Sequence, residues 1–451
     1  MHSSLKTIIH LAMLSCLSAC DREAPEVSHK SQTPELPSLS LTTPVRGVFL
    51  GVWGADRSSR GVDTEMEERR VWFAGGDAGD IPTQSTSLIA VYEPHDLLND
   101  HDGLSETDHD QLRLHYETPG GILWWVWGSG KRGEVWATGD QGTIVRLNEE
   151  RQAPEEDSEL WVREEIQMSR ETSLVYDLDK LVIWGAWGWR DPEGELTLWA
   201  VGGSVRRGGP KGVLLRRDAQ GIWRRVTHDI FPMENESDPL QGANFYKIWG
   251  RGSDVWIVGE GGVTLTARIE RETAGPQLSG WRAASLSSEG PELLFTVAGS
   301  VTSSSSDQSE DSSSSSSELG DTTWVVGGYD RGKAWRWNAQ SFEINREGWE
   351  RLDLPTRPAL NGVYVDSELV VGVGQRGSVT AWDPHVDLTS TPSVAQEWVS
   401  GADQMTLHSI WPHPQGGYWI VGGDLTTLRE GVILTPHQWD ATQPSLRRQT
   451  W

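Results

Sequence analysis

A short motif recurs along this chain: an apolar segment ending in Trp-Gly, a loop, and a second apolar segment ending in Gly. The clearest copies pair residues 126–128 with 134–139 and residues 248–250 with 254–259. One aromatic or apolar residue marks the second segment of each copy, at Trp72, Trp136, Trp199, Trp256, Trp324, Leu369 and Trp419. Because a supersecondary unit of this length cannot bury its apolar face alone, the repetition predicts a stack or ring of units.

Each copy continues with a glycine-rich turn and two further short segments of alternating polarity, such as 143–147 and 161–163 in the second copy. Alternation with a period of two and dense turn signals indicate antiparallel strands rather than helices. We therefore predict an all-β fold, a seven-bladed β-propeller of four-stranded antiparallel blades. Eight blades would also fit the chain length, because a blade needs roughly 40–50 residues.

The tryptophans at the repeated positions are expected in the core, since burying one indole removes about 150–250 Å² from water. Exposure for stacking on sugars is the alternative. Trp125 and Trp189 lie beside the repeated positions and are the better candidates for exposure.

The repeats resemble two kinds of known propeller repeat. In the fifth copy, Trp324 precedes the diglycine Gly327-Gly328, and Trp335 and Trp349 follow. This order is similar to a kelch repeat, and the tryptophan content resembles the tryptophan-rich propeller repeats of secreted and lipid-anchored bacterial proteins. The second, fourth and sixth copies depart from the diglycine pattern. The resemblance covers about residues 46–434 and implies a propeller that binds, rather than a particular reaction.

The N-terminus carries an export signal. Lys6 precedes an apolar segment that is too short to span a membrane. The sequence Leu17-Ser18-Ala19-Cys20 resembles the bacterial lipobox, which implies that Cys20 is acylated with fatty acids such as palmitate. An ordinary signal peptide is the alternative. Cys16 and Cys20 are the only cysteines, so a mature chain beginning at Cys20 would have neither a free thiol nor a disulfide.

These features predict three segments. Residues 1–19 form a lipoprotein signal peptide, residues 20–45 hold the lipidated cysteine and a disordered Pro-, Ser- and Glu-rich tether, and residues 46–451 form the propeller. The expected location is the bacterial cell envelope, and the inner and outer membranes both stay open.

The chain is acidic, with a formal net charge of −26, which opposes nucleic acid as a partner. A monomer is expected. Acidic residues also gather around Gly103, in a segment that resembles the calcium loops of secreted proteins. Its candidate ligands are Asp100, Asp102, Glu106 and Asp108. A plain solvated loop is the alternative, and no other cofactor is expected.

No catalytic residue is predicted, because the common catalytic motifs are missing from the sequence. Charged residues after the second strands could instead line one binding face of the propeller. They are Asp77, Asp140, Arg206, Arg207, Glu260, Asp330, Arg331, Arg376 and Asp424. Ordinary turn chemistry and solubility are the alternative explanations.

The preferred interpretation is a lipid-anchored binding or scaffold protein that docks an envelope protein or a glycan on one propeller face. One alternative is a glycan-active hydrolase or lyase, which would need two carboxylates converging near the channel. Another is a purely structural surface protein.

Overall fold

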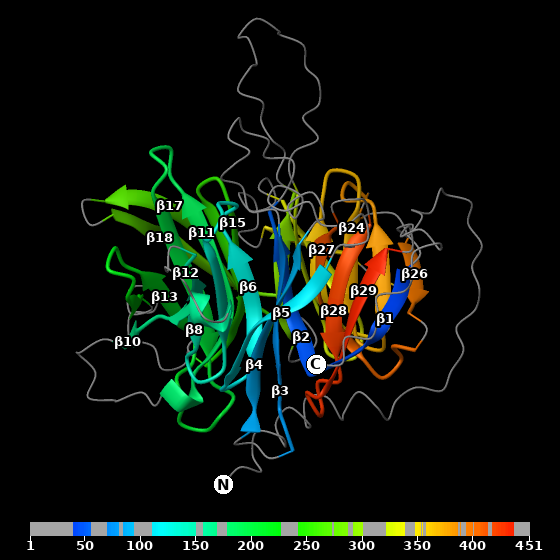
Figure 1. Cartoon of the computed structure of the whole chain (residues 1–451). Coiled ribbons are helices and arrows are strands. Elements are labelled where there is room, and N and C mark those ends of the chain that lie inside the picture. Colours follow the sequence, from blue (N-terminus) through cyan, green and yellow to red (C-terminus); the bar gives the residue numbers. More distant parts are fainter. Residues whose placement is uncertain are drawn as a thin grey trace, which may run out of the picture.

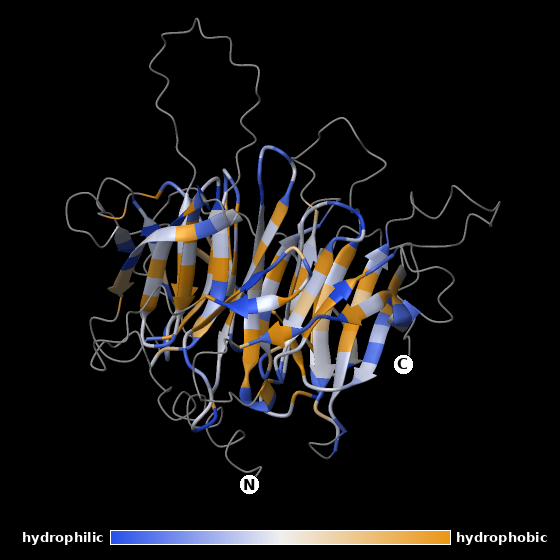
Figure 2. Cartoon of the chain, turned by 90° about the vertical axis from the view of Figure 1, so that its left-hand side faces the viewer, coloured by the Kyte–Doolittle hydropathy of each residue, from blue (hydrophilic) through white to orange (hydrophobic). Residues whose placement is uncertain are grey.

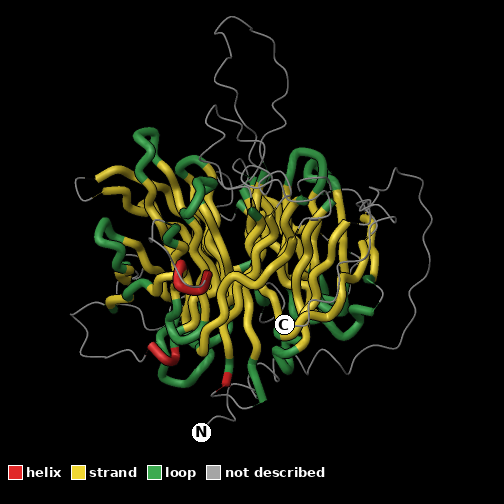
Figure 3. The backbone as a smooth tube through the Cα atoms, viewed as in Figure 1, coloured by secondary structure: helices red, strands yellow, loops and turns green. Residues whose placement is uncertain are grey.

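The computed structural model confirms the seven-bladed propeller: seven antiparallel sheets are arranged in a ring (Figure 1). Nearly all regular structure is β-strand, apart from short 3-10 turns such as Asp157–Leu160 and Leu178–Lys180 (Figure 3). No helix of the described residues is long and apolar enough to cross a membrane. The structure describes residues 39–55, 70–80, 84–93, 111–149, 157–168, 178–226, 242–272, 275–286, 292–300, 322–338, 348–352, 354, 358–386, 388, 394–399, 401–413 and 417–436.

The four strands of each blade follow one another from the centre of the ring outward. The first strands are β2 (Val48–Gly54), β6 (Leu123–Gly128), β11 (Val182–Arg190), β15 (Phe245–Arg251), β19 (Leu294–Gly299), β23 (Leu360–Val365) and β27 (Thr406–Pro412). The second strands are β3 (Val71–Asp77), β7 (Val135–Gly139), β12 (Leu196–Gly203), β16 (Asp254–Gly259), β20 (Thr323–Gly327), β24 (Val370–Gly374) and β28 (Tyr418–Gly423).

The third strands are β4 (Thr86–Glu93), β8 (Ile144–Leu147), β13 (Val213–Arg217), β17 (Val263–Glu272), β21 (Lys333–Trp337), β25 (Ser378–Trp382) and β29 (Glu430–Pro436). The fourth strands are β5 (Gln111–Pro119), β9 (Trp161–Arg163), β14 (Trp223–Arg225), β18 (Gly275–Ser285), β22 (Trp349–Leu352), β26 (Val394–Trp398) and β1 (Leu39–Arg46). A short extra strand, β10 (Ile166–Gln167), pairs in parallel with β14. Each first strand contacts the first strands of both neighbouring blades, and β27 contacts β2, so the ring is closed.

The last blade is completed from the other end of the chain. Strand β1 pairs antiparallel with β29, and Leu39 lies opposite Pro436 while Arg46 lies opposite Glu430. The prediction of a disordered tether through residue 45 was therefore wrong for residues 39–45. Their alternating Leu, Thr and Val residues are strand-forming, and pairing with β29 covers an edge that would otherwise expose unpaired backbone groups.

The repeated tryptophans of the second strands are buried, as expected: Trp72, Trp199, Trp324 and Trp419 are at most 1% exposed. In the sixth blade the equivalent residue is Val371, opposite Tyr364, and not Leu369, which precedes β24.

Trp125 and Trp189 are more exposed than the second-strand tryptophans, which is the direction expected. Both are partly buried, packed against clusters between neighbouring blades. Trp398 on the outermost strand β26 is the tryptophan with a large exposed surface, 51%, among the described residues. Tryptophans beside the repeated positions therefore also pack between neighbouring blades.

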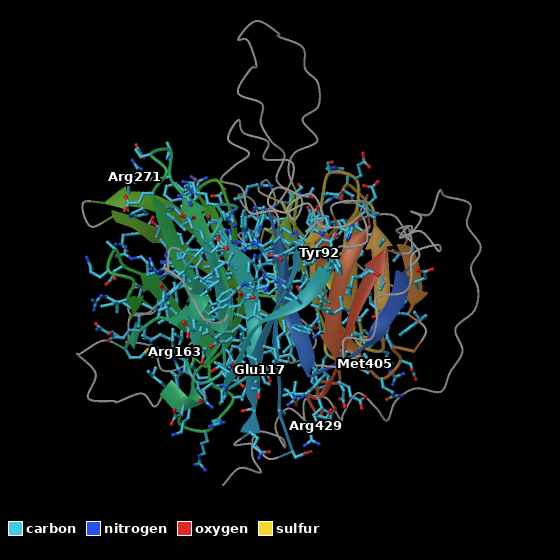
Figure 4. All side chains as sticks on the ribbon, in the orientation of Figure 1. Tyr92, Glu117, Arg163, Arg271, Met405 and Arg429 are labelled. Atoms are coloured by element: carbon cyan, nitrogen blue, oxygen red, sulfur yellow. The ribbon has the colours of Figure 1, made fainter. Side chains whose placement is uncertain are left out.

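The propeller has two faces. The loops between second and third strands, together with the links from one blade to the next, emerge at what we call the lower face. The loops between first and second strands emerge at the opposite, upper face. Arg271 on β17 and Arg429 before β29 mark the upper and lower ends of the strands (Figure 4). Apolar residues are concentrated in the strands and hydrophilic ones in the loops at both ends (Figure 2).

Candidate binding site at the channel mouth

Every first strand carries a β-bulge near its start. The register with the second strand shifts at one residue in all seven blades: Leu50, Trp124, Trp184, Tyr246, Phe295, Asn361 and His408. We call these seven residues the bulge ring. A bulge leaves one residue outside the ladder and re-aims its side chain, so the fold presents one extra side chain per blade.

The bulge ring surrounds the central channel near the lower face, and its members other than the buried Leu50 and Asn361 keep part of their surface accessible. The Trp124 and His408 rings lie 6.1 Å apart, although they belong to blades two and seven, with blade one between them. Side chains from non-adjacent blades can meet in this way only across the channel. Tyr246 contacts both neighbours, with ring centroids 5.1 Å from Trp184 and 5.9 Å from Phe295. These contacts form an aromatic lining in which Trp124, Trp184, Tyr246 and Phe295 keep part of their surface accessible.

A polar group sits at the rim beside this lining. The Asp140 carboxylate accepts hydrogen bonds from Trp124 Nε1 at 2.7 Å and from the Ile122 amide at 3.3 Å. Burial raises the pKa of Asp140, while these hydrogen bonds and the charge of Arg206 lower it by smaller amounts. Asp140 therefore fixes the orientation of Trp124 and joins a protonatable group to the aromatic lining.

Two basic side chains lie among the aromatic rings of the channel. The Lys247 ammonium lies 2.6 Å from the centroid of the Trp125 ring, and Lys247 is 5% exposed. His408 Nδ1 lies 2.7 Å from the Leu50 carbonyl oxygen. Burial lowers the pKa of Lys247 well below its usual value, and it lowers the pKa of His408 to about 4, to which the charge of Lys247 contributes. The channel wall is thus a place where positive charge is disfavoured.

The sequence-predicted face residues lie on the lower face, in loops between second and third strands, except Asp77, which is the last residue of the second strand β3. Four of their carboxylates have separate local partners. Asp77 binds Arg46 at 2.7 Å, and Glu260 binds Asn244 at 2.7 Å and Lys211 at 3.3 Å. Asp424 caps its own turn, accepting from the Thr426 amide at 2.8 Å. The fourth is Asp140. Since these four share no partner, the structure does not bring them together as a pair.

The predicted basic residues differ in how they are held. Arg206 donates to the Asp179 carbonyl at 3.2 Å, and Arg376 adopts a positive φ of 58° at its turn. Arg207, Asp330 and Arg331 are exposed. These three are the residues of the predicted set that are exposed as a whole, and the Glu260 side chain is also 41% exposed.

Two predicted sites fall on parts of the chain that the structure does not describe. They are the acylation site Cys20 and the acidic loop with Asp100, Asp102, Glu106 and Asp108. Within the described ranges no group of three or more His, Cys, Asp or Glu residues could hold a metal ion.

Sequence reasoning missed the bulge ring. A signal for it exists: each of the seven residues immediately follows an apolar residue at the start of a first strand, as Trp124 follows Leu123 and Tyr246 follows Phe245. Aligning the first strands by their Trp-Gly ends would have placed the seven residues in one column. A column that mixes leucine, aromatic, amide and imidazole groups differs from the uniformly apolar column that precedes it.

The fold and this mouth define a β-propeller protein with a bulge-lined channel. No protein-family model matches the chain, and no curated protein matches its sequence. Among solved structures the chain is similar to the crystal structure of the WD40 β-propeller domain of Doa1, with a TM-score of 0.46 and 9% sequence identity, over 89% of this chain and 98% of that chain. At this identity the likeness concerns the fold alone.

Proposed function

We propose that this chain is a non-enzymatic binding protein, anchored by a lipid on Cys20 in a bacterial envelope, that docks a partner over the channel mouth of the lower face. The observation that carries the proposal is the bulge ring with its partly accessible aromatic residues, bordered by exposed charges. A recognition site commonly combines apolar and aromatic lining with a few placed polar groups. Propellers supply such a site on a rigid closed scaffold.

The orientation of strand β1 indicates which face of the propeller would point away from the membrane. Strand β1 begins beside Pro436 at the upper end of β29 and ends beside Glu430 at its lower end. A tether that runs from Cys20 to Leu39 therefore meets the ring on the side of the upper face. The lower face is then turned away from the membrane and is open to a partner.

Docking is tested by photo-crosslinking in cells. A photoreactive residue is placed at Arg207 or Arg331 on the lower face, and the matched control is placed at Arg132, an exposed residue in the β6–β7 loop of the upper face. We expect one shared adduct from the two lower positions and none from Arg132. Adducts that form only from Arg132 would place the partner on the other face, and an absence of adducts at all three positions would favour the purely structural alternative.

Anchoring is tested separately with Cys20→Ser. We expect this variant to leave the membrane fraction and to lose metabolic palmitate labelling. If sedimentation and labelling are unchanged, Cys20 is not the anchor.

One observation favours a second candidate, cleavage of glycans. Glycoside hydrolysis needs a carboxylic acid that stays protonated and a second carboxylate. Burial raises the pKa of Asp140 beside Trp124, which fits the first role, while the predicted carboxylates of the lower face do not pair with Asp140 for the second. The test is turnover of a glycan panel by the natural protein and by Asp140→Asn, which keeps an acceptor for the Trp124 indole. Loss of turnover only in the variant would support this candidate, and a natural protein without turnover would remove it.

Calcium binding by Asp100, Asp102, Glu106 and Asp108 remains a proposal about the acidic loop. The affinity expected for such extracellular loops is about 10⁻⁴–10⁻³ M. Calorimetric titration of chelator-treated protein tests it, and an absence of heat at millimolar Ca²⁺ would return the segment to a solvated loop.

A further inference from the structure

Lys247 has an unusual position in the channel. It follows the bulge residue of β15 in blade four, and its ammonium reaches the Trp125 ring of blade two. Blade three lies between them and contributes Gly185 at the equivalent position. A Cβ built on Gly185 would lie 3.3 Å from Lys247 Cδ. Because Gly185 has no side chain, the Lys247 side chain can extend past blade three to Trp125.

This ammonium has no anionic partner among the described residues. The ion pairs of the structure do not include Lys247, and no acidic side chain counteracts the lowering of its pKa by burial. The face of Trp125 offers a cation only a partial substitute for water. A buried ammonium is strongly disfavoured unless it is paired or neutralised. Burial therefore favours the neutral amine of Lys247, and an anion placed beside it would stabilise the protonated form.

The surroundings restrict what can supply that charge. Lys247 lies one residue further along its strand than Tyr246 of the bulge ring, so an anion entering from the lower face passes the aromatic lining first. A carboxylate bonded to an apolar or aromatic group matches this order, because its charged end can reach the ammonium while its body packs against the rings.

We propose that Lys247 is a carboxylate-binding site within the channel, and that its ligand carries an apolar or aromatic group that packs against Trp124, Trp184 and Tyr246. The carboxylate belongs either to a free organic acid or to the partner docked on the lower face. In the second case the inference rests on the proposed function and names the group by which the partner is held.

The test is a calorimetric titration of the full chain with benzoate, with its uncharged analogue benzamide as the ligand control. We expect benzoate to bind, benzamide to bind at least tenfold more weakly, and Lys247→Met to lose the preference for benzoate. Lys131→Met removes an exposed lysine of the upper face and should bind as the natural protein does. Equal binding of benzoate and benzamide, unchanged binding by Lys247→Met, or no binding at millimolar benzoate would overturn the proposal.

A second measurement needs no variant and covers the case in which Lys247→Met does not fold. Lysines of the natural protein are acylated with and without benzoate, and the modified peptides are quantified. Benzoate should slow acylation at Lys247 and leave Lys131 unchanged, whereas an unchanged rate at Lys247 would contradict the proposal.

The source of the carboxylate is resolved with two short peptides of the same sequence, ending in Phe with a free carboxylate or with an amide. Binding of the acid peptide alone points to a docked chain, and binding of benzoate without either peptide points to a free acid. These titrations contain no cellular partner. Their failure therefore leaves the crosslinking result standing, and a failed crosslinking experiment leaves the carboxylate site standing.

Discussion

At the scale of single residues, one glycine per blade sets how closely the first two strands approach. These glycines lie at or near the ends of the second strands, and a Cβ on any of them would lie 1.8–2.3 Å from a backbone oxygen at the start of the first strand or of the residue just before it. They are Gly75, Gly139, Gly202, Gly259, Gly327, Gly374 and Gly422. No side chain can be accommodated at such distances without moving the backbone. The glycine repeat is therefore a steric requirement of the bulged strand pair.

This requirement gives a direct prediction. Gly259→Ala would place its Cβ 2.0 Å from the Asn244 oxygen, so we expect it to lower the free energy of unfolding by at least about 2 kcal/mol, as overpacking does. The control is Gly242→Ala, where a Cβ meets nothing within 4 Å. Denaturant unfolding of both variants measures the difference, and equal stability would show that the strands separate without cost.

A buried histidine makes stability depend on pH. Trp161 Nε1 donates to His115 Nδ1 at 3.0 Å, and His115 is 3% exposed. Burial lowers the pKa of His115 from 6.5 to about 4, because the imidazole is disfavoured as a cation there. The unfolded chain then binds a proton more readily than the folded chain, so stability is complete above pH 6.5 and falls as the pH drops toward 4.

The expected loss from His115 across that window is about 3 kcal/mol. Unfolding free energies at several pH values measure it in the natural protein and in His115→Gln, whose amide oxygen can still accept from Trp161. The variant should show a shallower decline that retains the part due to His408, whose pKa also lies at about 4. Identical pH profiles would mean that His115 does not contribute.

At the scale of the element, neighbouring blades interlock through the Trp-Gly pairs of the first strands. A Cβ on Gly128, Gly188, Gly250 or Gly299 would lie 2.4–2.5 Å from the tryptophan of the preceding blade. Those tryptophans are Trp53, Trp127, Trp187 and Trp249. Blade five has Ala298 in place of the tryptophan, and blade six has Val365 in place of the glycine. The two replacements occur together because a smaller residue on one blade leaves room for a larger one on the next.

The same exchange can be transplanted. Trp187→Ala should cost about 3–5 kcal/mol through the cavity it leaves, and Gly250→Val should be strongly destabilising on its own, because Trp187 occupies the space. The double variant copies the contact between blades five and six, so we expect it to be more stable than the sum of the single changes by at least 1 kcal/mol, the coupling typical of residues in contact. Strict additivity in this double-mutant cycle would contradict the interlock.

At the scale of the whole molecule, the ring is held shut by one strand from the far end of the chain. Strand β1 completes blade seven, and Arg46 at its end binds Asp77 of blade one. The closing strand is thus tied both to the last blade and to the first. Non-local pairing of this kind removes the free edge of the last sheet.

Two truncations test this closure. Removing residues 21–46 deletes β1, and we expect a large fall in the melting temperature together with a tendency to associate through the exposed β29 edge. Removing residues 21–38 keeps β1 and should leave the melting temperature nearly unchanged, because the pairing of β1 with β29 begins at Leu39. Thermal unfolding with light scattering measures both effects, and equal melting temperatures would show that β1 is not needed.

The local pattern predicted seven blades, with eight still compatible with the chain length, and it predicted the order of their strands and the burial of the second-strand tryptophans. Period-two alternation, turn glycines and Trp-Gly ends are properties of neighbouring residues, so they can be read along the chain. The local pattern also predicted that the charged residues after the second strands share one face, because all second-to-third-strand loops of a propeller emerge on the same side.

Only the tertiary structure decided which segment closes the ring and what lines the channel. The pairing of Leu39 with Pro436 joins residues at opposite ends of the chain, and composition alone made residues 39–45 look like a tether. Lys247 meets Trp125 only because the ring brings blades two and four to a common axis and blade three has a glycine there. Contacts across the axis depend on ring closure, which brings together residues that are far apart in the sequence and leaves no periodic signal along it.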